Sequence, residues 1–267
     1  MRYWVLSTLG AVLLLCSAFG KLNPDVNKVR KVVIDAGHGG RDPGTNYGSV
    51  LEKDIALSIA AKAGQYVEEH LENVEVIYTR QSDRFVELWE RAAIANREGA
   101  DAFISIHVNA HSRKSIYGTE TYAMGLHKNN DNFKIASREN SVIYMEDDLA
   151  RYEGFDPKKP SSYIIFNLQQ QKFQEQSVRL AELVETQFEK RVKRRSLGVK
   201  QAGFVVLYRT SMPSVLVETG FITNPDERAY LQSEQGQSYL ASGIFRAFRA
   251  YKQERERIGA EAQKSAQ

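Results

Sequence analysis

The sequence is poor in cysteine and lacks both a long apolar run and a charge excess of one sign. Cys16 is the only cysteine among 267 residues, which excludes an internal disulfide framework and a cluster of thiolate metal ligands. The apolar run from Val5 to Leu15 is shorter than the ~20 residues that a membrane-spanning helix needs. The 36 basic residues are nearly balanced by 33 acidic ones, giving a net charge of +3. This balance argues against a nucleic-acid-binding protein.

The first twenty residues have the features of a secretory signal peptide. Arg2 gives a positive start, an apolar stretch follows, and Ala18-Phe19-Gly20 fits the small-residue rule for cleavage. We therefore predict a signal peptide at 1–20 and a mature chain without cysteine. A lipoprotein anchored through Cys16 is a less favoured alternative, because a leucine directly before the cysteine fits that signal poorly. An uncleaved anchor is a third.

The rest of the chain alternates β-branched segments with amphipathic ones. An apolar stripe with a four-residue spacing predicts a helix from Glu52 to Leu71. Similar patterns predict strands at 31–36, 74–79, 102–108, 118–124, 204–207 and 215–217, and helices at 86–97, 173–192 and 239–251. Such alternation is typical of a single α/β domain with a mainly parallel sheet between helices. We place this domain at 28–255, followed by a fraying tail at 256–267.

The alternation is interrupted at 125–172, a segment rich in Asn, Asp, Lys, Ser and Tyr. It is too long for an ordinary connection between a strand and a helix. Residues 130–144 can form a helix, and Tyr163 to Phe166 is apolar. We interpret the segment as an insertion into the domain and not as a linker between two domains.

Four polar residues stand at strand ends or in the adjacent loop. His38 follows the first strand within a glycine-rich loop, and Glu52 lies where that loop enters the first helix. His107 ends the strand at 102–108, and Glu218 ends the strand at 215–217. The carboxyl ends of parallel strands share one edge of a sheet, so we expect these four side chains to converge there.

Two imidazoles and a carboxylate are a sufficient ligand set for a catalytic zinc ion, which keeps its fourth position for water. His38, Glu52 and His107 can provide this set, and Glu218 can act as the general base and acid. Each residue also has an ordinary structural explanation, such as a core histidine or a glutamate at a helix start. Their joint occurrence favours the site. The pair His107 and His111 lacks the glutamate of the H-E-x-x-H motif and is rejected as a zincin site.

The motif from Ile34 to Gly44, IDAGHGGRDPG, resembles the opening motif of the zinc-dependent N-acetylmuramoyl-L-alanine amidases of the Amidase_3 family. The similarity continues, in the same order, at 52–54, 78–83, 88–91, 105–110 and 213–224. It covers nearly the whole chain after the predicted signal peptide. None of the four key residues departs from the family pattern.

This resemblance implies a mixed six-stranded sheet flanked by helices. It implies one zinc ion held by His38, Glu52 and His107, with Glu218 as the catalytic glutamate. The reaction would be hydrolysis of the peptidoglycan amide that joins the lactyl group of N-acetylmuramic acid to L-alanine. Residues that would support the ligands or contact the substrate are Asp35, Arg80 and Asn109.

The insertion also has a counterpart in the resemblance. In the division amidases of Gram-negative bacteria, a helical segment at this place covers the zinc ion until an activator protein displaces it. By this likeness the protein would be a periplasmic monomer that acts in daughter-cell separation. We expect an acidic residue to reach the zinc, with Glu139 as the first candidate and Glu146 to Asp148 as the next. Alternatively, the insertion forms a wall of the substrate groove.

Two other functions stay open at this point. One is a zinc peptidase or amidase that acts on free peptides, which only substrate tests can separate from the first function. The other is a peptidoglycan-binding protein with an inactive site, against which the complete set of four residues argues. The basic run at 190–195 is either a surface for anionic polymers or, as we favour, a solvated helix end.

Overall fold

The computed structural model describes residues 27–126, 128–168 and 171–265. The predicted signal peptide at 1–20 lies outside the described residues. Among the described residues, no helix is long and apolar enough to cross a membrane.

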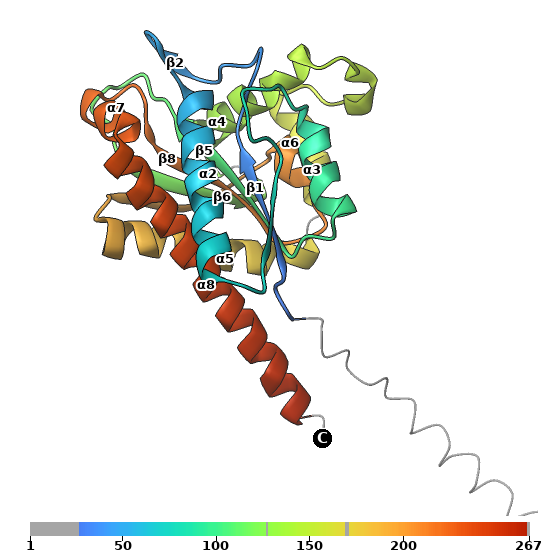
Figure 1. Cartoon of the computed structure of the whole chain (residues 1–267). Helices are drawn as coiled ribbons and strands as arrows, with labels where there is room; N and C mark the ends of the chain where they lie inside the picture. Colours follow the sequence, from blue (N-terminus) through green and yellow to red (C-terminus); the bar gives the residue numbers. More distant parts are fainter. Residues whose placement is uncertain (1–26, 127, 169–170, 266–267) are drawn as a thin grey trace, which may run out of the picture.

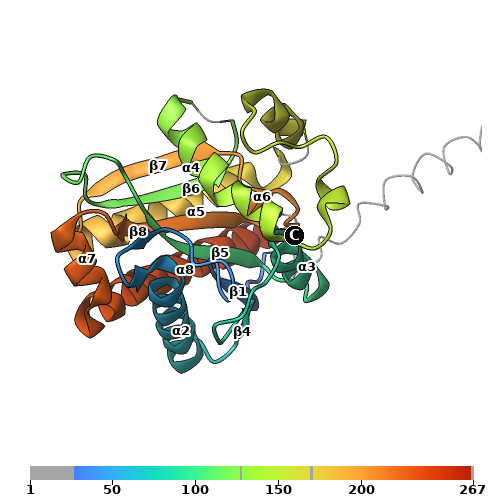
Figure 2. The same cartoon turned by 90° about the horizontal axis from the view of Figure 1, so that it is seen from above.

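A six-stranded sheet forms the centre of the domain (Figures 1 and 2). Its strands lie in the order β4 (Glu75–Tyr78), β1 (Lys31–Ala36), β5 (Ala102–Asn109), β8 (Ser214–Phe221), β6 (Thr119–Met124) and β7 (Ser196–Ala202). The first four run parallel, whereas β6 is antiparallel to β8 and parallel to β7. A small hairpin of β2 (Asn46–Tyr47) and β3 (Val50–Leu51) precedes the first helix. The predicted mixed six-stranded sheet is therefore confirmed.

Helices cover both faces of this sheet (Figure 2). One face packs against α2 (Glu52–His70), α5 (Gln174–Gln187) and α8 (Glu234–Ser265). The other packs against α3 (Leu88–Arg97), α4 (Asn130–Asn140) and α6 (Val205–Tyr208). A π-helical turn at Phe188–Val192 ends α5, and α7 (Pro225–Gln232) connects β8 to α8.

The alternation of side chains along β5 separates an apolar face from a polar one. Ile104, Ile106 and Val108 point into the core beneath α2, α5 and α8. Residues at the alternate positions point to the opposite face, and these include His107 and Asn109. All eight residues of β5 are buried, so the polar side chains must find partners inside the protein.

The strand predicted at 204–207 is wrong, because this apolar run forms the short helix α6. A short buried apolar run has no periodicity that separates a strand from a helical turn. The sixth strand is instead β7, which was not predicted. β7 lies at the edge of the sheet and reads SLGVKQA, so it lacks the continuous apolar character of a central strand.

The last helix does not end near Tyr251 as predicted, nor do the described residues of the tail fray. Helix α8 continues to Ser265 and projects beyond the body of the domain (Figure 1). Its extension is fastened to the start of the described chain, since Arg255 Nη2 donates to Asn27 Oδ1 over 2.6 Å. Gly259 also packs so closely on Asn27 that an added Cβ would lie 2.6 Å from the Asn27 Cβ.

The insertion is mostly helical and packs onto the sheet. After α4 come 3-10 turns at Ser141–Met145, Leu149–Tyr152, Pro160–Leu168 and Gln171–Phe173. Val142, Ile143, Tyr152 and Tyr163 share a core with Tyr122 of β6 and with Phe204. The segment is therefore part of the domain.

Glu146 of the insertion caps helix α3. Its Oε1 accepts from the backbone N–H of Leu88 over 2.7 Å, and its Oε2 accepts from the Tyr152 hydroxyl over 2.6 Å. Asp147 lies at the surface and pairs with Arg41, and Asp148 is exposed. None of the three belongs to the group of possible metal ligands in the described part of the chain, which corrects the expectation that one of them could reach the metal site.

Candidate metal centre and active site

Buried arginines hold the glycine-rich loop that carries His38. Arg91 Nη2 donates to the His38 carbonyl over 2.8 Å, and Arg80 Nη2 donates to the Gly37 carbonyl over 2.7 Å. Asp35 binds Arg91 Nη1 at 2.8 Å. His38 itself has φ of 60°, a conformation that is costly for a non-glycine residue and that the surrounding structure must impose. Asp35 and Arg80 are at most 2% exposed, and in this arrangement they support the loop.

Asp42 orients the His38 ring, and Glu52 links the start of α2 to the glycine-rich loop and to β5. His38 Nδ1 lies 2.7 Å from Asp42 Oδ2, which leaves Nε2 free to face the centre of the site. Glu52 is the first residue of α2. Its Oε2 accepts from the Thr45 N–H over 2.7 Å and its Oε1 from the Val108 N–H over 2.9 Å.

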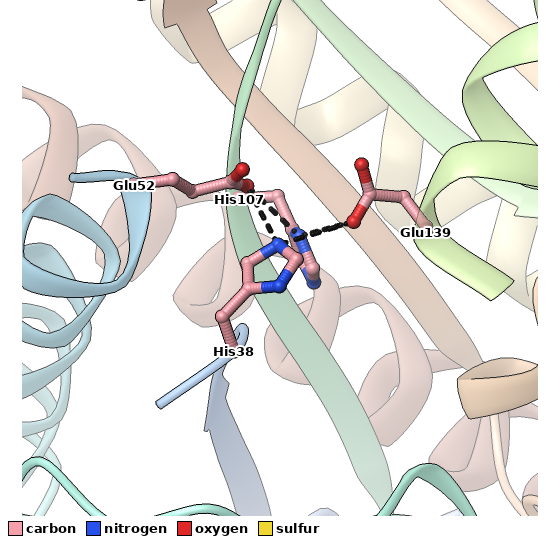
Figure 3. A group of neighbouring side chains, drawn as sticks. All are labelled: His38, Glu52, His107 and Glu139. Carbon is pink, nitrogen blue, oxygen red and sulfur yellow. Dashed lines mark hydrogen bonds and ion pairs between the residues drawn. The ribbon is translucent and has the colours of Figure 1, made fainter. Parts of the chain in front are cut away.

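Four buried donors from distant parts of the chain meet at this edge of the sheet: His38, Glu52, His107 and Glu139 (Figure 3). One donor atom of each lies within 4.8 Å of the others. His38 Nε2 lies 3.1 Å from Glu52 Oε1 and 3.1 Å from Glu139 Oε2. His107 Nδ1 lies 3.1 Å and 3.3 Å from the same two oxygens.

These four spacings fit ligands that share one metal ion. Ligands at 2.0–2.1 Å from zinc would be separated by about 3.3 Å, close to the 3.1–3.3 Å found between each imidazole and each carboxylate. Moreover, His38 Nε2 and Glu139 Oε2 have no hydrogen-bond partner although they are buried and only 3.1 Å apart. Their lone pairs converge on a point instead of pairing with each other, which is the arrangement that a shared cation requires.

The charges of the cluster also favour a cation. Burial by itself lowers the pKa of His107, but its contacts with Glu139 and Glu52 raise that pKa to about 9. Burial likewise lowers the pKa of His38, and the charge of Glu52 with the contacts to Asp42 and Glu139 raises it well above its usual value. The pocket therefore attracts positive charge, and a divalent cation would balance the two glutamates while both imidazoles stay neutral.

Gly44 packs directly against two of these donors, and Gly48 offers a control position with a similar backbone conformation. A Cβ added there would lie 2.6 Å from His38 Cδ2 and 2.7 Å from Glu52 Oε2. Gly44→Ala is expected to weaken metal binding by about 10- to 100-fold, as lost support around ligands typically does. Gly48 has a similar positive φ, 63° against 65°, but nothing within 4 Å. Gly48→Ala, with the same backbone cost, should therefore bind metal normally in a competition titration, and equal losses in both variants would contradict the steric explanation.

Glu218 lies within β8, which continues to Phe221, and is paired in register with His107 of β5. It is fully buried, and neither of its oxygens has a hydrogen-bond partner. Burial raises the pKa of Glu218 well above its usual value, and the charges of Glu139 and Glu52 add to this effect. A carboxyl group with a raised pKa and free oxygens beside a metal site is suited to exchanging protons.

A cation from the insertion lies close to Glu218. Arg138 Nη2 lies 3.8 Å from Glu218 Oε1. The same guanidinium bonds Glu139 Oε1 through Nε at 2.9 Å and Asn109 Oδ1 through Nη2 at 3.1 Å. Helix α4 therefore places Glu139 at the metal cluster and the preceding Arg138 close to Glu218.

Comparison with known proteins decides the family. Residues 32–250 match the model of Amidase_3, N-acetylmuramoyl-L-alanine amidase. This chain belongs to that family. The amidase is 31% identical to AmiA of Escherichia coli K12 over 237 residues, which is 86% of this chain and 80% of AmiA.

Solved amidases share the fold. The crystal structure of an N-acetylmuramoyl-L-alanine amidase from Clostridium difficile 630 superposes with a TM-score of 0.63 at 29% identity, covering 84% of this chain and 97% of that one. AmiC2 of Nostoc punctiforme superposes with a TM-score of 0.60 at 31% identity over the same shares. The chain is thus a hydrolase of the cell-wall amidase class.

Several residues that shape the site of this amidase were not among the predicted ones. Asp42 orients His38, Arg91 holds the His38 backbone, and Arg138 approaches Glu218. Asp42 could have been found, since it lies four residues after His38 in the quoted motif. Arg91 lies in the family-like segment 88–91 and Arg138 directly precedes the candidate Glu139, but their partners could not be predicted because they depend on how α3 and α4 dock on the sheet.

Proposed function

We propose that this amidase uses a zinc ion held by His38, Glu52 and His107 to hydrolyse the bond between N-acetylmuramic acid and L-alanine in peptidoglycan. The observation that carries the proposal is the group of four buried donors within 4.8 Å of one another, beside a buried carboxylate without a hydrogen-bond partner. Family membership supports the choice of bond. A bound zinc ion would polarise the scissile carbonyl and make a water molecule more acidic.

In this proposal Glu218 carries the proton transfers. Its free oxygens would accept the proton of the attacking water and then deliver it to the leaving nitrogen of L-alanine. A raised pKa suits the second step, because the protonated carboxyl group must persist long enough to act as an acid. Glu52 would stay ionised throughout, since burial raises its pKa but the charge of His38 and other contacts lower it overall.

We further propose that helix α4 closes the active site. Glu139 takes the place that a substrate carbonyl or water would need, and Arg138 pairs with Glu218. His38 and His107 are at most 6% exposed and Glu52 is fully buried, so a glycan chain cannot approach the donors in this arrangement. These contacts favour the closing role of α4 over a role as a groove wall.

Product identification tests the reaction. Purified peptidoglycan would be incubated with the zinc-loaded chain and with the Arg138→Ala/Glu139→Ala variant, and the products analysed by mass spectrometry. Stem peptides that begin with free L-alanine are expected, most abundantly from the variant. Substitution is preferable to trimming 126–172, because that segment contributes Tyr152 and Tyr163 to the core. Cleavage of free peptides alone would support another zinc peptidase, and wall binding without zinc or products would support a binding protein.

The cellular setting follows from the same proposal. In this proposal the amidase is exported to the periplasm and acts in cell-wall remodelling and daughter-cell separation. An activator protein would release α4, so that hydrolysis occurs only where it is needed. The test is to locate the protein and to examine the septa in cells that produce the Arg138→Ala/Glu139→Ala variant. These cells should lyse or shed wall fragments. Normal growth with that variant in the periplasm would argue against control through α4.

Removal of the metal is expected to lower the melting temperature by about 10 °C. Binding at 1,000 times the dissociation constant adds ~4 kcal/mol, and each kcal/mol is worth ~2–4 °C in a domain of this size. Without the cation, Glu52 and Glu139 would be buried like charges. Thermal unfolding with and without 1,10-phenanthroline measures the change, and zinc re-addition is the control. An unchanged melting temperature would contradict a metal bound in the core.

A further inference from the structure

A buried polar network lies beneath α4 and is not used by the reaction as proposed above. Glu120 of β6 is 4% exposed and is paired across the sheet with Glu218 of β8. Its Oε1 lies 2.5 Å from Lys200 Nζ, and its Oε2 accepts from the Tyr122 hydroxyl over 2.6 Å. Oε2 also accepts from Asn109 Nδ2 over 3.2 Å. A network that is fully satisfied this deep in a protein specifies one geometry.

This geometry fixes which end of the Asn109 side chain faces the active site. A carboxylate can only accept hydrogen bonds, so the Glu120 side of the amide must be its NH2 group. On its other side, Asn109 Oδ1 accepts from the Ala110 N–H over 2.7 Å. The amide cannot flip without losing both bonds. Asn109 Oδ1 is therefore a fixed acceptor, and it points at Arg138.

Arg138 and Glu139 present to the site the two polar functions of a peptide bond. Glu139 brings an oxygen to the metal donors, where the proposed reaction needs the scissile carbonyl. Arg138 brings N–H groups to Asn109 Oδ1 and towards Glu218, where the proposed reaction needs the amide nitrogen side. The Arg138 guanidinium thus places N–H donors where these acceptors would receive an N–H of the substrate.

We propose that Asn109 Oδ1 accepts a peptide N–H of the stem peptide when α4 is displaced, and that Glu120 is the positioning residue that keeps this oxygen facing the substrate. The inference rests on the proposed amidase reaction. Tyr122 and Lys200 serve it by holding the Glu120 carboxylate in place. Burial and the charge of Glu120 raise the pKa of Tyr122, so its hydroxyl remains a donor.

A donor–acceptor exchange tests the inference in the Arg138→Ala/Glu139→Ala background. Glu120→Gln frees the Asn109 amide to flip, and is expected to lower kcat/KM for N-acetylmuramoyl-tripeptide by about 10-fold, the upper value for one hydrogen bond. Asn109→Asp places two carboxylates together and should lower it further. In the double variant Asn109→Asp/Glu120→Gln, the amide NH2 group at position 120 faces a carboxylate oxygen at position 109. The other carboxylate oxygen at position 109 faces the substrate. It should recover to within about 3-fold of the background.

Glu185→Gln is the matched control. Glu185 is also a buried carboxylate that contacts β6, but it binds Thr119, Thr121 and Ser196 on the opposite face. It should lower the melting temperature without changing kcat/KM. Failure of the double variant to recover, or an equal kinetic loss in Glu185→Gln, would overturn the inference.

A second readout separates this inference from the proposed reaction. Binding of the product L-alanyl-γ-D-glutamyl-diaminopimelate to the zinc-loaded variants would be measured by calorimetry, without turnover. The same order is expected, with weakened binding in the two single variants and recovery in the double variant. If every variant is inactive but product binding follows this order, the proposed reaction is rejected, whereas the role of Asn109 as an acceptor for the peptide stands. Equal binding by all variants would overturn the inference.

Discussion

Glu218→Gln is expected to lower peptidoglycan hydrolysis by about 10³-fold, within the range for loss of a general acid–base group. The substitution keeps the shape of the side chain but removes its ability to exchange a proton. Glu218 is fully buried and neither oxygen has a hydrogen-bond partner, so no hydrogen bond is lost. The measurement is the rate of release of stem peptides in the Arg138→Ala/Glu139→Ala background, where the site is open.

The zinc content of Glu218→Gln separates a chemical role from a structural one. Glu218 does not belong to the four-residue donor cluster, so the variant should bind one zinc ion per chain as before. Loss of zinc together with activity would mean that Glu218 holds the metal site in shape. Activity within 3-fold of the parent would show that another group moves the proton.

Glu139→Ala is expected to raise the activity of the full chain by about 100-fold. This is the increase expected if closed and open chains are present at about 99:1 and the substitution makes all of them open. The physical reason is that Glu139, as proposed, would occupy a metal position in competition with the substrate, while His38, Glu52 and His107 would still hold the ion. The measurement is the initial rate on purified peptidoglycan with saturating zinc.

Asp131→Ala provides the control on the same helix. Asp131 is exposed and forms an ion pair with Lys134 within α4, so its substitution should leave the rate unchanged. A fall in activity and zinc affinity in Glu139→Ala would instead identify Glu139 as a permanent ligand. Glu139→Gln should give an intermediate rate, because a neutral amide oxygen is a weaker metal ligand than a carboxylate.

The sequence is sufficient to locate the donors of the central sheet. His38 and His107 interrupt or end apolar segments that must be buried, and a polar residue in such a place needs partners. Glu52 marks the start of an unmistakable amphipathic helix. Parallel strand ends share one edge, so their convergence follows from the α/β pattern. The structure places them together with Glu139, the first acidic candidate of the insertion.

The periphery could not be predicted in the same way. The edge strand β7 has a mixed polar sequence, and the apolar turn α6 resembles a strand when only its composition is considered. Glu120 gains its place from the antiparallel register of β6 on β8, which sets it opposite Glu218. That register depends on long-range pairing, which no local pattern in the sequence encodes. The roles of Arg138 and Asn109 depend in turn on it.

The placement of α4 between β6 and α5 has a consequence for how the enzyme responds to its own abundance. Both neighbours are packed into the sheet, so Glu139 is tethered at both ends and stays near the metal donors at an effective concentration of ~mM or more. In the proposed closed state, dilution cannot release Glu139, because it is part of the same chain. The closed fraction is then the same for one exported molecule as for a thousand, and wall hydrolysis would follow the supply of whatever displaces α4, not the supply of enzyme.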